Sequence, residues 1–452
     1  MSGPKVVRIV TREEIVAICR GQLAQLGSSI EEWERVGRRN GTVTDADVEA
    51  VLRRRDEIRR LLERDRFVDL QKAVPAEIDY LRSDQQARLA RAAAEAAAER
   101  SARVRTAAVA AAVVHRLQSA EIAIPDDLRR ELDEIAAGRS EAGGAVSRAL
   151  SLLAPGPDGG VTERQRELAA ALRGDDGREG IQQWIAAQVP EADPGVTRLE
   201  ARISELSALR GDAAVSPFEE RLRSALDAPA ARRGLLMDSL EADLASALRA
   251  ATSRAVLQAE LRALAAELSG SGHADLARLA DTIERRVDAD DDELRQLAAS
   301  ATRARERFYA GVAAHARRQA ILSGLAGLGY QVSEGMETAW VQDGRVVVKN
   351  ASRPGYGVEI AGGADAARLQ LRTVAFRSPG AAADPARDTD AETLWCGDLH
   401  ALEARLATEG GALHIDIAKP AGSVPLKVVA DEEAIHSAID QARPGSRKLT
   451  AG

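Results

Sequence analysis

Cys396 and His400 have the residue types and the spacing that nucleophilic chemistry requires. They are four residues apart in a segment with helical periodicity, so their side chains would share one face of a helix. A cysteine beside a histidine can form an activated thiol or half of a metal site. Catalysis would also need an orienting group, and Asp398 lies off that face. The plainer alternative is that Trp395 and Cys396 pack together in a core next to a surface histidine.

An acidic run from Asp288 to Glu293 has the D-x-D-x-D opening of a calcium-binding loop. Such a loop needs glycine at its sixth position and glutamate at its twelfth. Glu293 and Ala299 occupy these positions, and the helical periodicity of the apolar residues continues through the run. We therefore expect a solvated acidic turn or the start of a helix, and no metal-binding residues in the chain.

Arginines cluster near the N-terminus, where guanidinium groups could bind phosphate. Acidic residues are interleaved with them, so ion pairs along solvated helix faces explain the pattern better. The predicted C-terminal strands bring a second group of arginines and a tyrosine close together, but the sequence does not assign them to one face of a sheet. The candidate interaction residues from the two groups are Arg53, Arg54, Arg59, Arg60, Arg353, Tyr356 and Arg372.

The motifs of several common enzyme classes are absent from the sequence. There is no G-x-x-x-x-G-K-[ST] for a phosphate-binding loop, no G-x-S-x-G, no H-E-x-x-H, and no G-x-G-x-x-G between a strand and a helix. Each of these chemistries depends on the local backbone that its motif provides. We therefore expect no catalytic and no cofactor-binding residues, and a protein that is not an enzyme.

The composition indicates a helical protein. Aromatic residues make up only 3% of the 452 residues, so rings cannot supply most of the buried area. The core must be built from Leu, Ile, Val and a large amount of Ala, which is the best helix former. Abundant Ala, Glu, Leu and Arg with helical periodicity indicates long helices or coiled coils. The net charge of −8 argues against a general nucleic-acid binder but leaves room for a local basic patch.

Capping signals place two helices near the N-terminus. Thr11 followed by Glu14 is a capping box, and an apolar stripe continues from there to Trp33. Thr44 can cap a second helix after an Asn-Gly turn. We expect the second helix to run on until Pro75 kinks or breaks it, because proline lacks the amide donor that a helix needs.

Three further segments complete the helical part of the chain. Residues 78–122 contain neither Gly nor Pro and predict a rod with a thin apolar stripe, which suits a two-helix seam. Residues 138–234 hold short helical stretches separated by Gly and Pro, and we interpret them as a helical tip with Trp184 and Phe218 in its core. Residues 236–312 indicate a long helical hairpin with a Gly-rich turn.

From residue 329 onward the apolar residues alternate, which predicts strands. Asp343-Gly344 is a strong hairpin signal, and we expect it to connect a strand through Trp340 with a strand through Val348. Further strands are predicted at 355–360, 369–376, 413–417 and 424–429, and helices at 389–408 and 432–442. These elements predict a compact α+β domain with an antiparallel sheet.

The sequence thus predicts a mainly α protein of long, coiled-coil-like antiparallel helical hairpins with a helical tip, plus a small C-terminal α+β domain. The expected domains are 1–137 (hairpin and rod), 138–234 (tip), 235–328 (second hairpin) and 329–452 (α+β). No stretch approaches the ~20 apolar residues of a membrane span, and the first residues lack the apolar run of a signal peptide. With two widely separated cysteines, we expect a cytoplasmic protein.

These observations favour a non-enzymatic scaffold or adaptor subunit of a bacterial multi-protein assembly. Its helices would form a rod that spaces or oligomerises, and its C-terminal domain would dock a protein partner. One alternative is a nucleic-acid-associated accessory factor, with phage defence as one setting. Another is an enzyme with an unrecognised site near Cys396 and His400. We expect no cofactor and no association with membranes.

Overall fold

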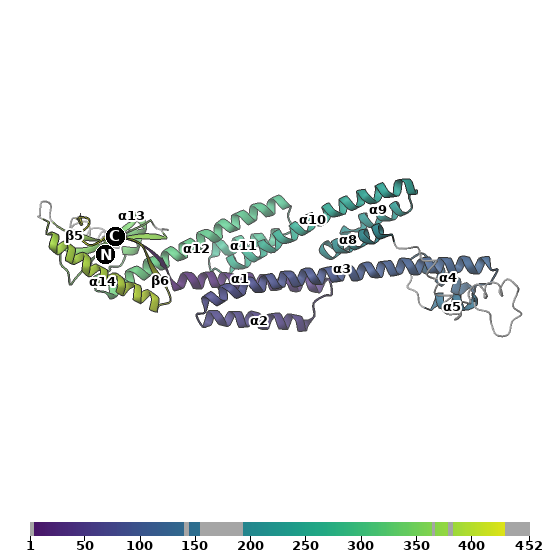
Figure 1. The fold of residues 1–452 in the computed structure, drawn as a ribbon, viewed down its shortest axis with the longest axis horizontal. Coiled ribbons are helices and arrows are strands. Elements are labelled where there is room, and N and C mark those ends of the chain that lie inside the picture. The colour runs from purple at the N-terminus through teal and green to yellow at the C-terminus, as the bar shows by residue number, and fades with distance from the viewer. Residues whose placement is uncertain (1–3, 140–143, 154–192, 364–366, 378–382, 430–452) are drawn as a thin grey trace, which may run out of the picture. The chain divides into compact units, whose positions relative to one another are not determined.

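The structure is a computed structural model of the chain, and it describes residues 4–139, 144–153, 193–363, 367–377 and 383–429 (Figure 1). The fold is mainly helical, with a small antiparallel sheet in the C-terminal part of the chain, as the sequence predicts. The chain forms two compact units, which are described separately. The helical unit comprises Glu32–Val48 and Tyr80–Val256, and the sheet unit comprises Met1–Glu31, Glu49–Asp79 and Leu257–Gly452.

Both predicted N-terminal caps are present. Helix α1 (Arg12–Arg39) follows Thr11, whose hydroxyl accepts a hydrogen bond from the backbone N–H of Glu14 at 3.3 Å. Helix α2 (Asp45–Glu63) follows Thr44, whose hydroxyl accepts from the backbone N–H of Asp47 at 3.3 Å. The Asp47 carboxylate in turn accepts from the backbone N–H of Thr44 at 2.9 Å. These bonds satisfy amide donors that the first turn of a helix leaves without partners.

The break after the second helix does not lie at the predicted proline. Helix α2 ends at Glu63, and α3 (Phe67–Ser119) continues through Pro75, so of the expected kink or break at this proline the break was wrong. The turn before α3 is made by Asp65, whose φ of 56° is a left-handed conformation that a helix cannot include. Burial of the neighbouring Leu70 and Val74 keeps α3 helical despite the hydrogen bond that proline removes.

Short helices form the remainder of the helical unit, together with part of α10 (Ala230–Ser269). Helices α4 (Asp126–Ala136) and α5 (Ala145–Leu153) pack with the C-terminal part of α3 in one apolar core. Helices α8 (Pro194–Arg210) and α9 (Ser216–Leu226) share another core with α10, and Phe218 packs against it as expected. A single 3-10 turn at Asp212–Ala214 connects α8 and α9. The other predicted core residue, Trp184, lies outside the described residues.

In the sheet unit, the return arm of the predicted second hairpin consists of two helices. Helices α11 (Ala274–Arg286) and α12 (Asp291–Gly327) pack with the C-terminal part of α10 around one apolar core. The division falls at the acidic run, where Asp290 caps α12 by accepting from the backbone N–H groups of Asp292 and Glu293 at 3.1 and 2.9 Å. The prediction of a helix start at this run is confirmed.

The sheet has the strand order β2-β3-β4-β5-β1-β6, with antiparallel neighbours along this path, and β7 pairs in parallel with β5. The strands are β1 (Lys5–Val10), β2 (Tyr330–Gln331), β3 (Arg345–Asn350), β4 (Tyr356–Ala361), β5 (Arg368–Phe376), β6 (Ala412–Ala418) and β7 (Lys427–Val429). Strands β4 to β7 and α14 (Pro385–Thr408) correspond to predicted elements. The predicted helix at 432–442 lies outside the described residues.

Strand β1 was missed from the sequence although it is an interior strand of the sheet. It lies between β5 and β6, with Lys5 opposite Leu371 on one side and opposite Ala418 on the other. Its sequence, KVVRIV, is rich in β-branched residues, and its burial alternates along the strand. That alternation is a strand signal. Its partners are more than 350 positions away in the sequence, so no local pattern could identify them.

The predicted hairpin at Asp343-Gly344 was also wrong. Residues Met336–Asp343 form helix α13, and Gly344 ends it in the left-handed conformation with a φ of 68°. An Asp-Gly pair satisfies a hairpin turn and a helix C-terminus equally well, because both need a residue at positive φ. Burial of Ala339 and Trp340, which fits one helix face, favours the helix here.

One face of the sheet holds the main apolar core of this unit. Side chains from β1, β3, β4 and β5 pack there with α12, α13 and α14 around Trp340 and Trp395. The interpretation of Trp395 as a core residue is therefore confirmed. Among the helices of the described residues, none combines the length and the apolar character that crossing a membrane requires.

Candidate interaction surface on the sheet

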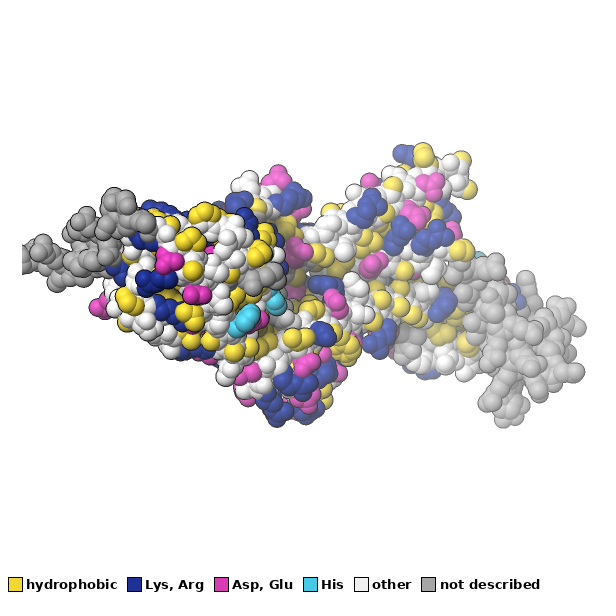
Figure 2. Space-filling view, turned by 60° about the vertical axis from the view of Figure 1, so that its left-hand side comes forward, with side chains coloured by type: hydrophobic (Ala, Val, Ile, Leu, Met, Phe, Trp, Pro, Cys, Tyr) yellow, Lys and Arg dark blue, Asp and Glu magenta, His cyan; other side chains and the backbone are white. Residues whose placement is uncertain are grey.

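The face of the sheet opposite the core is rich in positive charge. Alternate residues of each strand point to opposite faces, so the neighbours of the core residues on β1, β3 and β5 point away from the core. Figure 2 shows Lys and Arg side chains interspersed with apolar ones over the sheet unit. We call this surface the cationic face, and define it by Arg8, Arg345, Lys349, Glu359, Arg368, Arg372, Asp416 and Lys427.

Glu359 organises the centre of the cationic face. It lies directly opposite Arg372 in the β4–β5 register and is only 1% exposed. Its carboxylate accepts from Arg372 Nε at 2.9 Å and from Lys427 Nζ at 2.6 Å. Burial favours the neutral acid, but these charge-assisted bonds outweigh burial and hold the pKa of Glu359 below its ordinary value. Both cations are thus held in fixed positions on the face.

Asp416 has the same role at the β6 side of the face. Arg8 and Arg368 are directly opposite each other on β1 and β5, a like-charge pair that destabilises a sheet unless it is neutralised. The Asp416 carboxylate lies 3.1 Å from Arg8 and 2.9 Å from Arg368. The hydrogen bond from Arg8 lowers the pKa of Asp416. Both arginines remain well exposed, so an external anion can reach them.

The ring of Phe376 on this face already has partners. Phe376 covers Gly357, where a Cβ would meet the ring at 2.7 Å and the carbonyl oxygen of Val348 at 2.5 Å. Lys349 Nζ lies 4.6 Å from the ring centroid, a cation–π distance. Sheets that bind single-stranded nucleic acid by stacking usually offer several rings in succession. Because Phe376 is covered by a lysine, its ring is not open for a base to stack on.

Strand β6 forms an edge of the sheet. Within the described residues it pairs with β1 alone, so its other side has backbone groups without a neighbouring strand. Ile415 and Ile417 are 37% and 57% exposed on it. Exposed apolar edge strands promote association between chains, and proteins usually shorten, charge or cover them. This edge is seven residues long, contains a β-bulge at Asp416, and lies next to Arg8 of β1.

Two candidate residues from the C-terminal strands turn away from the cationic face. Arg353 binds Asp398 of α14 at 2.5 Å, and the Tyr330 hydroxyl donates to the same carboxylate at 2.7 Å. Tyr356 donates to Asp388 of α14 at 2.8 Å. Of these three predicted residues, Arg372 alone belongs to the cationic face. Arg353 lies in the turn between β3 and β4, and Tyr356 is on the core side of β4. Proximity in sequence therefore grouped residues that the structure places apart.

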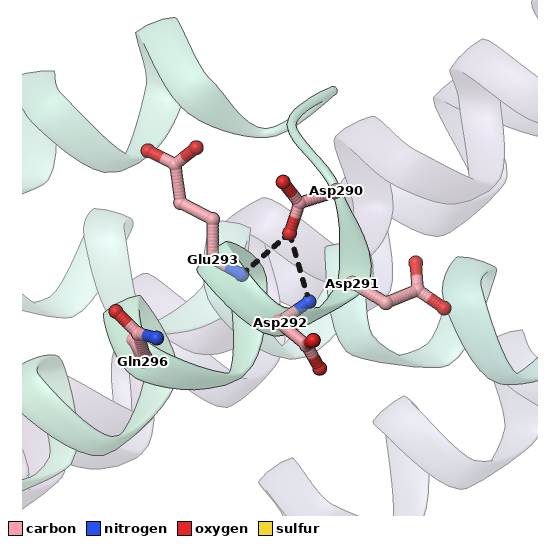
Figure 3. Close-up of a pocket in the computed structure, with 5 residues that line it drawn as sticks. All are labelled: Asp290, Asp291, Asp292, Glu293 and Gln296. Carbon is pink, nitrogen blue, oxygen red and sulfur yellow. Dashed lines mark hydrogen bonds between the residues drawn. The ribbon is translucent and has the colours of Figure 1, made fainter.

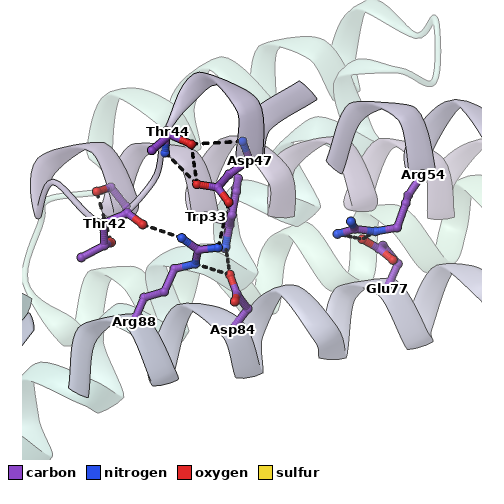
Figure 4. Close-up of polar contacts among 9 residues, drawn as sticks. Trp33, Thr42, Thr44, Asp47, Arg54, Glu77, Asp84 and Arg88 are labelled. Atoms are coloured by element: carbon purple, nitrogen blue, oxygen red, sulfur yellow. Dashed lines mark hydrogen bonds and ion pairs between the residues drawn. The ribbon is translucent and has the colours of Figure 1, made fainter. Parts of the chain in front are cut away.

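The candidate arginines of the N-terminal part lie on α2. Arg54 binds Glu77 of α3 at 2.9 Å (Figure 4), and Arg53 lies 3.8 Å from Glu49 on its own helix. The side chains of Arg59 and Arg60 are exposed. Ion pairs with acidic neighbours, as the interleaved sequence predicts, are present at the first two positions.

Cys396 and His400 have different surroundings. Cys396 lies on the side of α14 that faces the sheet, where its sulfur accepts a hydrogen bond from Lys5 Nζ at 2.9 Å. The His400 side chain is 70% exposed, and its Nδ1 lies 3.7 Å from Glu403. Asp398, expected to lie off the face of this pair, binds Arg353 and Tyr330 instead. The geometry therefore associates the thiol with a lysine.

The acidic run lines an open hollow on the surface at the start of α12 (Figure 3). The residues around this hollow are Asp290, Asp291, Asp292, Glu293 and Gln296. One oxygen of Asp290 is occupied by the two backbone N–H groups that it caps, while the side chain of Asp291 points away from it. The arrangement is that of a helix cap on a solvated acidic turn.

A polar cluster in the helical unit was not anticipated from the sequence. Arg88 of α3 donates to Asp84 at 2.7 Å and to the carbonyl of Thr42 at 2.5 Å, and its guanidinium lies 5.6 Å from the Trp33 ring (Figure 4). Trp33 Nε1 donates to Asp84 at 2.8 Å, and Asp47 lies 3.2 Å from Arg88. The cluster fixes the turn between α1 and α2 against α3, so its role is structural.

No family model matches this chain, and no curated protein or solved structure is similar to it at a significant level.

Proposed function

We propose that this chain is a non-enzymatic interaction subunit that binds an extended segment of a partner protein along the edge of β6. The exposed edge with two isoleucines beside the cationic face is the observation that carries the proposal. An added strand would satisfy the backbone groups of β6 through main-chain hydrogen bonds, a common mode of peptide recognition. The sheet would then have a covered edge in place of an exposed apolar one.

The surroundings of β6 define the chemistry of the partner segment. A β-bulge at Asp416 interrupts the pairing of β6 with β1, so that Ile415 lies opposite Val7 and Ile417 lies opposite Val6. The two isoleucines therefore point to opposite faces of the sheet, and Asp416 binds Arg8 and Arg368 on the cationic face. A strand added beside β6 would place apolar side chains beside the isoleucines and acidic side chains near the two arginines. The proposed partner segment therefore contains both apolar and acidic residues.

The helices supply the scaffold part of the proposal. Helices α3, α10 and α12 are 53, 40 and 37 residues long and are rich in Ala, Leu, Arg and Glu. Helices of this length can space binding sites or pair as coiled coils, within a homo-oligomer or a larger assembly. A bacterial cytoplasmic multi-protein assembly is the setting that we propose, in line with the composition.

The test places a photo-crosslinking amino acid at Ile417 of the full-length protein in its native host. The control position is Leu394 of α14, which is similarly exposed, at 52% against 57%, but not on a strand. We expect a protein crosslink specific to position 417, mapped by mass spectrometry to an extended apolar and acidic segment. Crosslinks of equal yield at both positions, or none at 417, would reject the proposed edge.

Binding of the mapped segment as a synthetic peptide then tests the contacts. Ile417→Lys should weaken binding by about tenfold or more, equivalent to about 1.4 kcal/mol, and Arg8→Glu should weaken it further at low salt. Leu394→Lys is the matched control and should bind as the wild type does. Equal affinity of the Ile417→Lys variant and the control would contradict strand addition.

Nucleic-acid binding is the second candidate, because six cationic side chains share the cationic face with two carboxylates. It is the weaker candidate because the Phe376 ring is covered by Lys349 and four of the cations are already engaged by Glu359 and Asp416. It predicts salt-sensitive binding of single-stranded DNA or RNA that Lys349→Glu abolishes and Ile417→Lys does not change. That pattern would replace the strand-addition proposal. The enzyme alternative has no comparable support among the described residues, since His400 projects into solvent.

A further inference from the structure

Lys5 and Cys396 meet inside the sheet unit although 391 positions separate them in the sequence. Lys5 is the first residue of β1 and is only 2% exposed. Its Nζ lies 2.9 Å from the sulfur of Cys396 on α14. Among the described contacts, this is the hydrogen bond that the Lys5 ammonium makes. The pair thus joins β1, an interior strand of the sheet, to the helix α14 that packs on it.

A thiol is an unusual partner for a buried lysine, whose charge normally requires a carboxylate. Glu392 lies one turn before Cys396 on α14 and is also almost fully buried. Its carboxylate accepts from the backbone N–H of Gly422 at 2.6 Å. Burial raises the pKa of Glu392, and the positive charge of Lys5 offsets part of that rise. A direct hydrogen bond from the lysine goes to the sulfur instead.

We propose that Lys5 and Cys396 form an oxidation-dependent covalent cross-link, in which the lysine nitrogen bonds to the cysteine sulfur. The inference rests on the contact between these two side chains and is independent of the docking function proposed above. A peroxide is the oxidant at this modification site. The product is a sulfenamide that links β1 covalently to α14.

The chemistry needs one equivalent of peroxide and no further oxidant. The thiol loses two electrons, the O–O bond of the peroxide breaks, and the products are a sulfenic acid on Cys396 and water. The Lys5 ammonium group first releases one proton to solvent, and the neutral amine then attacks the sulfur, so that an N–S bond forms and the S–O bond breaks. The hydroxyl leaves as water with a second proton from the nitrogen. Two equivalents of an added thiol reverse the link: the first releases the amine and forms a mixed disulfide with Cys396, and the second restores the cysteine while the two added thiols leave as a disulfide.

The second cysteine of the chain provides an internal comparison. Cys19 is fully buried on α1, and burial raises the pKa of its thiol. A buried thiol with a raised pKa reacts slowly because the thiolate is the reactive form. Cys396 is only partly buried, so it is more open to a small oxidant than Cys19. Oxidation is therefore expected at Cys396 first.

The test uses the full-length wild-type protein and hydrogen peroxide. After treatment, remaining thiols are alkylated, the protein is digested without reductant, and the peptides are analysed by mass spectrometry. We expect a peptide pair joined between Lys5 and Cys396 whose mass is two hydrogen atoms below the sum of the separate peptides, and which dithiothreitol separates. Cys396 recovered only as the free thiol or as sulfinic or sulfonic acid, with Lys5 unmodified, would overturn the proposal.

Variants identify the reacting atoms. Lys5→Arg keeps the positive charge but removes the primary amine, and Cys396→Ser removes the sulfur, so both should lose the linked peptide. Lys349→Arg is the matched control at another lysine of the sheet and should keep it. The digest of the wild-type protein shows by itself whether the linked peptide forms. The proposal can therefore be rejected even if a variant folds poorly.

Discussion

At the scale of single residues, Glu359 shows how one buried carboxylate holds a positively charged surface together. It is bonded to Arg372 and Lys427, which are both partly exposed. Without it, Arg372 on β5 and Lys427 on the neighbouring strand β7 would lose the counter-charge that they share. The cationic face therefore depends on this acid both for stability and for the positions of its cations.

Glu359→Gln should destabilise the sheet unit by about 1–3 kcal/mol at neutral pH, because it removes one partner of a buried ion pair whose cations are partly solvated. The pKa of Glu359 is lowered in the folded protein. Its contribution is thus fully present above the unfolded-state pKa and is lost as the pH falls through the native pKa. Urea unfolding of the wild type and the variant should therefore converge in acid.

Glu409→Gln is the control for this prediction, since Glu409 makes an exposed pair with Arg405 one turn away. Surface pairs of this kind contribute little to stability. The control should unfold close to the wild type at every pH. A difference between Glu359→Gln and the wild type that stayed constant from neutral to acid pH would show that the ionised carboxylate is not the source of the effect.

At the scale of elements, glycine sets how closely α1 can approach its neighbours. A Cβ at Gly21 would lie 1.9 Å from the Tyr309 hydroxyl of α12 and 2.8 Å from the Glu267 carboxylate of α10. That hydroxyl donates to Glu267 at 2.6 Å, and Gln25 of α1 donates to the same carboxylate at 2.6 Å. The close approach thus permits a polar contact that joins three helices.

Gly21→Ala should lower the free energy of unfolding by about 1–3 kcal/mol, because the added methyl group displaces the Tyr309 hydroxyl from Glu267. Gly27→Ala on the same helix meets nothing within 4 Å and should be neutral or stabilising by up to about 1 kcal/mol through helix propensity. Chemical denaturation of the two variants measures both. Equal effects at the two glycines would show that α1 does not need the close approach.

At the scale of the whole molecule, the sheet unit is built from both ends of the sequence. Strand β1 comes from the first ten residues and pairs with β5 and β6 from the last hundred. It also contributes Val7 and Ile9 to the core beneath α12 and α14. The predicted C-terminal domain is therefore complete as a sheet only when the N-terminal strand is included.

Deletion of residues 1–10 should disrupt the sheet unit, because β6 would lose its partner and the core would lose Val7 and Ile9. Hydrogen exchange should then show loss of protection in β5 and β6, while α8 and α9 in the helical unit stay protected. A synthetic β1 peptide supplied in trans should restore part of the protection. If hydrogen exchange in β6 were the same with and without residues 1–10, the pairing of β1 between β5 and β6 would be contradicted.

The sequence by itself determined most of the local structure. Capping residues at Thr11 and Thr44, the low aromatic content and the long apolar periods predict the helices, and the alternation after residue 355 predicts β4 to β7. These signals are local, since a helix or a strand shows its buried face in the spacing of neighbouring residues. The positions of Asp290 as a helix start and Trp395 as a core residue follow from the same patterns.

Only the tertiary structure showed which strands pair and which side chains from distant parts of the sequence meet. It placed β1 between β5 and β6, paired Lys5 with Cys396, and bound Arg372 to Glu359 on the cationic face but Arg353 to Asp398 of α14. It also resolved the Asp343-Gly344 turn in favour of a helix, because only the packing of Trp340 distinguishes the two uses of a residue at positive φ. The order of the strands, and the face of the sheet to which each side chain points, depend on contacts between residues far apart in the sequence. A short stretch of sequence does not show these contacts.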